Sequence, residues 1–303
     1  MNFKHLETLV RVAELGSFSK ASVVLGVAQP ALSRQVRMLE VELHQTLLLR
    51  NGRGVRLTDA GRRLFDHSVG ILEQVERARE DLAAGRDEPL GRVVVGLPPS
   101  VGLQFTLPLI DRFRAKWPKA KLAVVEGLST HIAEWITSGR IDFGVVFNPE
   151  PQAAIEVTPL REENLCLVSP VAKRKRAPPA PLPLAELAAF PLVIPERGHV
   201  IRKLLESHAS LAGFKLDIAW EVSSVPAIID LVRAGYGHAV LTASGVKASA
   251  RAPELSVRPI VQPRLVSVLC LALPAHKKPT PLAKQTAALV AELMRQRSHA
   301  ETR

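Results

Sequence analysis

The stretch VAQPALSRQVRMLEVEL, residues 27–43, decides the fold of the N-terminal part of the chain. Its apolar residues recur at the spacing of one helix face: Leu32, Val36, Leu39 and Leu43. The opposite face carries Pro30, Ser33, Arg34 and Arg37. A proline in the first turn of a helix lacks only an N–H group that has no partner there in any case. The stretch therefore predicts a helix with a stiff N-terminus that exposes a serine and two arginines.

Two shorter helices are predicted before this one. Residues 3–14 carry apolar side chains at helical spacing, and Gly16 ends that helix. Ser17 is a suitable N-cap for the next helix, which reads FSKASVVLG and ends at Gly26. Two short helices, a tight turn and a third helix form a helix-turn-helix. In that setting, the exposed serine and arginines of the third helix suit phosphates and base edges in a major groove. The alternative, which a single helix of this kind would favour, is a solvated charged face on an ordinary helical domain.

Residues 47–65, LLLRNGRGVRLTDAGRRLF, add a second basic element. They predict two short extended segments joined by a glycine-rich turn, and the arginines of this hairpin are Arg50, Arg53 and Arg56. Such a wing could insert arginines into a minor groove, where the negative potential is concentrated. The alternative is a basic hairpin without a ligand, but its position directly after a helix-turn-helix favours the wing.

Thr58 then caps a long helix that is predicted to run to about residue 86. Its apolar stripe is wider than an exposed helix of a monomer would carry, and consists of Ala60, Leu64, Phe65, Leu72, Val75, Ala78 and Leu82. A packed pair of such helices is the simplest way to cover the stripe, and a dimer would present two reading heads to a two-fold-symmetric DNA site. The alternative is that the stripe packs on its own chain.

The chain has 303 residues, enough for two domains, and a net charge of +11. This charge suits a polyanionic partner, but it does not locate a DNA site, because residues 1–92 hold 14 Lys and Arg against 12 Asp and Glu. Aromatic residues make up 4% of the chain, fewer than a protein that stacks bases on aromatic platforms usually has.

Cysteine, histidine and hydropathy patterns exclude several classes of protein. Cys166 and Cys270 are not in a C-x-x-C arrangement, so neither a disulfide framework nor a cysteine-ligated zinc site is supported. The nine histidines show no metal-ligand spacing. No apolar run reaches the length of a membrane span, and the N-terminus is charged and amphipathic, unlike a signal peptide. We therefore expect a cytoplasmic protein without a metal or a cofactor.

Beyond a polar joint at residues 85–91, strands alternate with helices. Three predicted strands, RVVVGL, KLAVVEG and IDFGVVF, alternate with two helices, a rhythm that predicts a parallel sheet with helices on its faces. Further strands and helices follow a proline-rich loop, and a final helix closes the chain. Two of the strands echo each other, LCLVSP at residues 165–170 and LCLALP at residues 269–274.

Taken in order, the elements S-F-S-x-A, Q-P-A-L-S-R-Q, R-x-x-R-G-V and L-T-x-A-G resemble the DNA-binding segment of LysR-type transcriptional regulators, at that family's spacing. With Arg37 from the exposed helix face, the DNA contacts that the resemblance implies are Gln29, Pro30, Ser33 and Arg34 on the recognition helix and Arg50 and Arg53 on the wing. Two positions depart from the family pattern. Ala28 stands where a serine or threonine is usual, so a capping or phosphate-binding hydroxyl is missing. Leu48 stands where a phenylalanine is usual, which should change only core packing.

The same resemblance implies an α+β multi-domain chain, with an N-terminal winged helix-turn-helix, a long linker helix and a C-terminal effector domain similar to periplasmic solute-binding proteins. We expect the DNA-binding domain at residues 1–58, the linker and dimerisation helix with its joint at 59–90, and the effector-binding domain at 91–303. The two echoing strands would join two α/β lobes, lobe I at about 91–165 and 270–303 and lobe II at about 166–269. The two cysteines would then be buried thiols on these strands.

Ligands of such domains bind between the lobes, beyond the carboxyl ends of the strands, where helix N-termini offer N–H groups and a positive dipole to an anion. The matching positions are Ser100, Val101, Ser129, Thr130, Phe147, Arg197, His199, Ser224 and Thr242, with Pro99 and Asn148 beside them. Most of the hydroxyls among them also have a structural explanation as N-caps. The set resembles sites for small organic anions.

The sequence thus predicts a dimeric or tetrameric transcription regulator without catalytic activity. Its partners would be double-stranded DNA, a small-molecule effector, further copies of the chain and, for an activator, RNA polymerase. One alternative is a constitutive DNA-binding protein whose C-terminal domain serves only oligomerisation. Another is an enzyme or solute-binding domain fused to a DNA reader, for which the sequence shows no paired acid–base residues.

Overall fold

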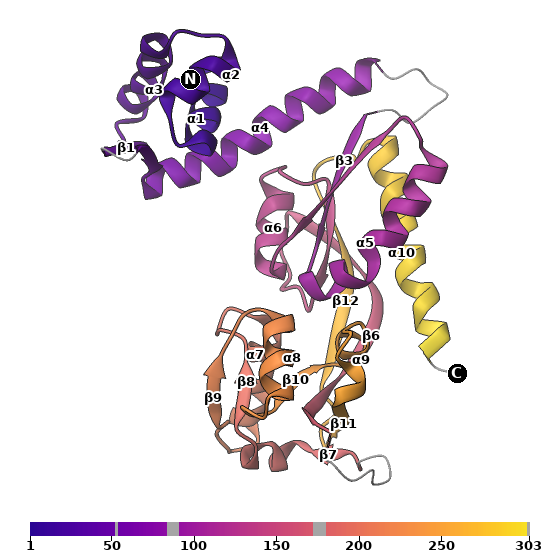
Figure 1. Cartoon of the computed structure of the whole chain (residues 1–303). Helices are drawn as coiled ribbons and strands as arrows, with labels where there is room; N and C mark the ends of the chain where they lie inside the picture. Colours follow the sequence, from indigo (N-terminus) through magenta and orange to yellow (C-terminus); the bar gives the residue numbers. More distant parts are fainter. Residues whose placement is uncertain (52–53, 84–90, 172–179, 302–303) are drawn as a thin grey trace.

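The computed structural model describes residues 1–51, 54–83, 91–171 and 180–301. Figure 1 shows an N-terminal domain at one end, the long helix α4 (Asp59–Ala83) beside it, a first α/β lobe in the middle and a second lobe at the other end. No helix within the described ranges is long and apolar enough to cross a membrane.

The N-terminal domain consists of α1 (Phe3–Leu15), α2 (Phe18–Leu25), α3 (Gln29–Leu43), β1 (Leu48–Asn51) and β2 (Gly54–Leu57). The Ser17 hydroxyl accepts a hydrogen bond from the Lys20 N–H, and Gly16 and Gly26 take the left-handed conformation after α1 and α2. The apolar stripes of the three helices meet in one core, which includes Leu9, Phe18, Ala21, Leu32, Val36 and Leu39. This arrangement confirms the predicted helix-turn-helix.

The antiparallel hairpin β1–β2 is fixed against the helices. The Val55 N–H donates to the Gly16 carbonyl at 2.9 Å, and the Glu40 carboxylate accepts the Leu47 N–H at 2.9 Å. Gly54, with φ +136°, approaches the α1–α2 turn so closely that a Cβ would lie 2.8 Å from the Gly16 oxygen. The hairpin therefore has the position of a wing beside the helix-turn-helix.

Lobe I is a sheet covered by helices on both faces. Its strands lie in the order β4 (Lys121–Glu126), β3 (Arg92–Leu97), β5 (Phe143–Phe147), β12 (Val266–Pro274) and the first part of β6 (Ile155–Pro170). As predicted, β3 pairs in parallel with β4 and β5, whereas β12 pairs antiparallel with β5 and β6. One face packs against α5 (Pro99–Lys116) and α10 (Pro281–Glu301), and the other against α6 (Ser129–Thr137).

Lobe II is built around the second part of β6. Its remaining strands are β7 (Leu182–Pro183), β8 (Leu192–Ile194), β9 (Ile218–Glu221), β10 (Ala239–Thr242) and β11 (Leu255–Val261). Its helices are α7 (Val200–Leu211), α8 (Val225–Arg233) and α9 (Ala243–Lys247), with short 3-10 helices at Leu184–Ala189 and Ala252–Glu254. Both β10 and β11 pair antiparallel with β6. The strand pairs around β6 in lobe II therefore differ from the parallel pairs that β3 forms with β4 and β5 in lobe I.

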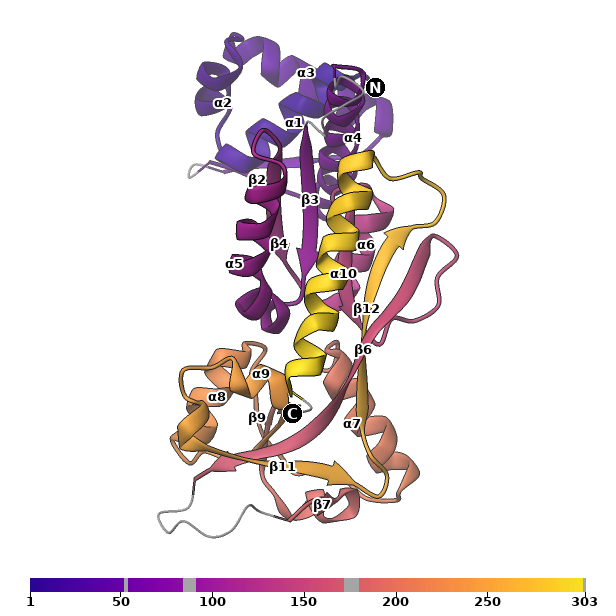
Figure 2. The same ribbon diagram turned by 90° about the vertical axis from the view of Figure 1, so that its right-hand side faces the viewer.

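Two chain segments cross between the lobes, and Figure 2 shows β6 running through both. On β6, Asn164 is the last residue paired with β12 and Leu165 the first paired with β10. The returning segment crosses between Leu265, which belongs to the lobe II core, and Val266, where β12 begins. The second crossing therefore lies between Leu265 and Val266, a few residues before the predicted boundary at about 270, and the stretch LCLALP pairs throughout with lobe I strands.

The linker helix α4 contacts both the N-terminal domain and lobe I. Its first half packs on the helix-turn-helix core through Ala60, Leu64 and Ile71. Gly70 lies against the chain after α6, where a Cβ would be 2.1 Å from the Ser138 carbonyl oxygen. Glu73 forms an ion pair of 3.7 Å with Arg92 at the start of β3. The helix and lobe I are thus in direct contact. Residues 84–90, which hold the predicted end of the helix and all of the predicted joint except Gly91, lie outside the described residues.

Candidate functional site

The helix α3 presents the predicted DNA-reading surface. Gln29, Pro30, Arg34 and Arg37 are exposed, and Ser33 is half-buried. No ion pair engages either arginine within the described part of the chain. The N-cap Ala28 makes no side-chain hydrogen bond to the first turn, as the sequence departure predicts. The exposed end of α3 therefore combines backbone N–H groups with two cations, which suits DNA phosphates and base edges.

Part of the predicted wing, the hairpin β1–β2, lies outside the described residues. Arg50 lies in β1, opposite Val55, but its side chain is outside the described residues, as is the whole of Arg53. Gln35, within the Q-P-A-L-S-R-Q element, has a structural contact instead, because it accepts a hydrogen bond from Thr8 Oγ1 at 2.5 Å and ties α3 to α1.

An open groove of about 1,090 Å³ lies between α1, α4 and the start of β3. Its apolar lining consists of Phe3, Val10, Val69, Leu72, Val75 and Val94. The stripe predicted along α4 therefore divides in two, since its first half packs on its own chain and part of its second half lines this groove. The side chain of Leu82 lies outside the described residues.

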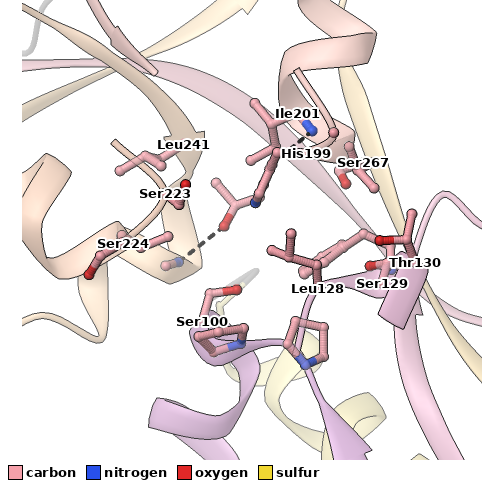
Figure 3. Close-up of a pocket in the computed structure, with 18 of the residues that line it drawn as sticks. Ser100, Leu128, Ser129, Thr130, His199, Ile201, Ser223, Ser224, Leu241 and Ser267 are labelled. Carbon is pink, nitrogen blue, oxygen red and sulfur yellow. Dashed lines mark hydrogen bonds between the residues drawn. The ribbon is translucent and has the colours of Figure 1, made fainter. Parts of the chain in front are cut away.

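A cavity of about 200 Å³ lies between the lobes, and Figure 3 shows side chains from both lobes facing each other across it. The first turns of four helices line it: α5 and α6 from lobe I, and α7 and α8 from lobe II. Apolar side chains, including Leu128, Phe147, Ile201 and Leu241, form much of the wall. Among the described residues, no Lys, Arg, Asp or Glu lines this cavity. The groups in its wall that favour an anion are therefore helix N-termini and their N–H groups rather than charged side chains.

His199 contributes a hydrogen-bond donor without adding charge. It is the N-cap of α7, and its Nδ1 accepts the Ile201 N–H at 3.2 Å. Burial lowers the pKa of His199 below its usual value, although the nearby Glu196 acts in the opposite direction. The neutral ring then carries its proton on Nε2, which has no hydrogen-bond partner among the residues described.

Most of the predicted effector residues lie at this cavity: Ser100, Ser129, Thr130, Phe147, His199, Ser224 and Thr242, together with Pro99. Some of these hydroxyls have structural bonds, since Ser129 Oγ accepts the Phe147 N–H at 3.0 Å and Thr242 Oγ1 accepts the Gly245 N–H at 3.2 Å. The hydroxyls of Ser100, Thr130 and Ser224 have no such bond within the described ranges.

Two predicted effector residues do not lie at the cavity. Val101 is 2% exposed and packs in the lobe I core, because the turn of α5 directs it inward from Ser100. Arg197 is in the exposed loop before α7, and its guanidinium lies 4.0 Å from the Glu206 carboxylate. Asn148, which the sequence analysis places beside the site, has a structural contact: its side-chain oxygen accepts the Val268 N–H at 2.6 Å and links the end of β5 to β12.

Sequence reasoning missed other lining residues, among them Leu128, Gly198, Ile201, Ser223, Leu241 and Ser267. Ser267 was detectable in principle, because it is a polar residue in an otherwise apolar strand, and it is 1% exposed. Ser223 adds a second serine before α8. The apolar members carry no sequence signal that separates a cavity wall from a core.

A buried charged pair lies on β6 beside the crossing. Arg161 and Glu163 form an ion pair, and their side chains are 5% and 7% exposed. The Ser244 hydroxyl of α9 donates to the other Glu163 oxygen at 2.5 Å, and Arg161 lies over the ring of Phe105 on α5, 5.7 Å from its centre. This group of side chains therefore connects a helix of lobe I to a helix of lobe II. Sequence analysis did not identify it.

Both cysteines are buried free thiols, as expected. Burial raises the pKa of the Cys166 thiol to about 11, against a smaller lowering effect of its hydrogen bond with the Ala243 backbone. Burial also raises the pKa of Cys270. Since the thiolate is the reactive form, the raised pKa of both groups makes them less reactive near neutral pH than exposed cysteines.

Comparison with known proteins assigns a family to both the N-terminal and the C-terminal part of the chain. Residues 3–62 match the family of bacterial regulatory helix-turn-helix proteins called lysR, and residues 86–295 match the LysR substrate binding domain. The nitrogen assimilation regulatory protein nac of Escherichia coli (strain K12) is 30% identical over 285 residues, which cover 94% of this chain and 92% of that protein.

Solved structures of full-length regulators share the whole fold. An OxyR variant from Pseudomonas aeruginosa is 26% identical and superposes with a TM-score of 0.70, covering 97% of this chain and 95% of that one. CbnR, a LysR family transcriptional regulator, is 24% identical with a TM-score of 0.71, covering 97% and 99%. A winged helix-turn-helix, a linker helix and a two-lobed domain thus occur here in the order of that family, and the chain belongs to the LysR family of DNA-binding transcriptional regulators with an effector-binding domain.

Proposed function

We propose that a small organic anion, bound in the cavity between the lobes, controls DNA binding through α3 and the wing. The observation that supports this most directly is the convergence of four helix N-termini, two from each lobe, on one cavity without charged side chains. An anion that contacts both lobes binds more tightly to the lobe arrangement in which both contacts are made. It shifts the equilibrium towards that arrangement by the difference between its affinities for the two arrangements. The proposal includes no catalytic step.

The size of the cavity limits the ligand. Its volume of about 200 Å³ is below the range of about 300–1,000 Å³ typical of sites for drug-sized ligands. A small metabolite with one anionic end and an apolar body fits the helix N-termini and the apolar wall.

The proposal also includes self-association. The groove between α1 and α4 leaves Phe3, Leu72 and Val75 with part of their apolar surface open to solvent. A second copy seated there would cover these side chains and place a second α3 beside the first, as a two-fold-symmetric DNA site requires.

A thermal-shift screen of the full-length protein against a few hundred organic and amino acids tests the effector site. We expect a dose-dependent rise in the midpoint for at least one acid, and a loss of about tenfold in its affinity in Ser100→Ala, because that hydroxyl is free to bind an anion. The exposed serine of α7 in Ser207→Ala is the matched control and should leave binding unchanged. If no acid binds while DNA binding is intact, the constitutive alternative is favoured.

Replacing Arg34 with alanine should weaken binding to the preferred DNA site about ten- to a hundredfold, the loss expected for one base-reading arginine. The operator is obtained by selecting bound sequences from a random DNA pool with the wild-type protein, and affinities are measured by fluorescence anisotropy at fixed salt. Arg114→Ala removes the same charge from an exposed site on α5 and serves as the control. Equal weakening by both variants would show that α3 does not read the site.

A further inference from the structure

A second cavity adjoins the one between the lobes. It has a volume of about 410 Å³ and shares four lining residues with the first: Ser129, Thr130, Phe147 and Val200. From these residues it runs one helical turn further along both lobes, to Ala133 on α6 and to Lys203 and Leu204 on α7. The two cavities therefore meet at these four residues, between the first turns of α6 and α7.

The second cavity differs from the first in its charges. Among the described residues that line the two cavities, Lys203 is the one with a cationic side chain and Glu150 the one with an anionic side chain. Lys203 belongs to lobe II, whereas Glu150 follows β5 of lobe I, and their charged groups lie 3.2 Å apart. The two side chains are 53% and 79% exposed. Such an exposed pair contributes little to stability, so an incoming anion can displace Glu150 without a large loss.

We propose that the effector is a dianion, a linear dicarboxylate, and that Lys203 is the residue that selects its second carboxylate. This inference rests on the proposed function. One carboxylate lies at the N-termini of α5 and α6, the carbon chain passes Phe147, and the other carboxylate pairs with the Lys203 amino group in place of Glu150. The ligand then contacts lobe I at one end and Lys203 of lobe II at the other, and its second carboxylate adds an ionic contact that a monocarboxylate lacks.

Isothermal titration calorimetry on the full-length protein tests this with matched pairs of acids. Succinate, glutarate and adipate are compared with butanoate, pentanoate and hexanoate, which have the same numbers of carbons. We expect at least one dicarboxylate to bind about fivefold more tightly than its monocarboxylate partner, the effect of one partly screened ion pair. The preference should shrink as salt is added, because the Lys203 pair is exposed.

Three variants assign the preference to Lys203. In Lys203→Gln the dicarboxylate should bind no better than the monocarboxylate, whose affinity stays at the wild-type value. In Glu150→Gln the preference should grow, because the competing carboxylate is gone. Lys215→Gln, at an exposed lysine of lobe II outside both cavities, is the matched control and should keep the wild-type preference.

The outcomes separate this inference from the proposed function. If both acids of each pair bind equally and Ser100→Ala weakens both, the anion site stands and the dicarboxylate assignment is wrong. A preference that survives Lys203→Gln also overturns the role of Lys203. If none of the six acids binds in a way that depends on Ser100, the dicarboxylate inference fails, and a hit of another class in the wider screen would retain the anion site alone.

Discussion

Replacing Arg161 with methionine should lower the free energy of unfolding of the effector domain by about 3–5 kcal/mol, the loss expected when one partner of a buried ion pair is removed. The Glu163 side chain is 7% exposed, and without the guanidinium its charge is left buried with one hydrogen bond, from Ser244. Urea unfolding followed by tryptophan fluorescence measures the change, since the three tryptophans of the chain all lie in this domain: Trp117, Trp135 and Trp220.

A double variant separates loss of the pair from loss of packing. Arg161→Met combined with Glu163→Leu removes both charges and keeps the volume, so it should recover most of the lost stability. A single variant within about 1 kcal/mol of the wild type would mean that water reaches the Glu163 carboxylate and that the pair does not hold the lobes together.

Gly61→Ala should have the second largest effect, on both stability and DNA binding. The Gly61 N–H donates to Thr58 Oγ1 at 2.9 Å, and the Thr58 hydroxyl donates to the Thr46 carbonyl at 2.6 Å, which places the first turn of α4 against the chain before the wing. A Cβ on Gly61 would lie 2.0 Å from the Leu47 carbonyl oxygen, so the helix and the wing must separate. Overpacking of this kind lowers stability by about 1–3 kcal/mol.

Calorimetry of the full-length protein and anisotropy with the selected operator measure the two consequences. Because the wing moves relative to α3, we expect DNA affinity to fall by about tenfold, the loss of one or two phosphate or groove contacts. Gly198→Ala, measured in the absence of any effector because Gly198 lines the cavity between the lobes, is the control, since a Cβ there meets nothing within 4 Å. Wild-type stability together with wild-type affinity in Gly61→Ala would contradict the close approach of α4 to the wing.

The N-terminal domain was predictable because its signals are local. Ser17, Gly16 and Gly26 define helix ends within a few residues of themselves, and these caps are present. Three strands were missed, the first part of β6, the short β7 and all of β11, and each contains a proline: Pro159, Pro183 and Pro259. Proline weakens a strand pattern, but Pro159 lies where the β6–β12 register shifts, a bulge that tolerates it.

The site was predictable only where it follows from topology. Serines and threonines at the starts of helices after strands lie at the cavity because the ends of those strands meet there. Val101 shows the limit, since the next residue along a helix turns by about 100° and can leave the cavity for the core. The bond from Ser244 to Glu163 joins residues 81 apart, and it exists only because of how the two lobes sit on each other.

Because Gly70 has no Cβ, α4 packs closely against lobe I, so the two lobes differ in how they are attached to the linker helix. Backbone approach to Ser138 and the Glu73–Arg92 pair tie lobe I to α4, while lobe II lies at the far end of the molecule (Figure 1). Lobe I and the N-terminal domain are therefore both held against α4. If the lobes close over a ligand as proposed, lobe II is the part that we expect to move relative to them. We therefore expect a bound ligand to change the position of lobe II relative to the DNA-binding domain, and a second copy that contacts lobe II would be displaced with it.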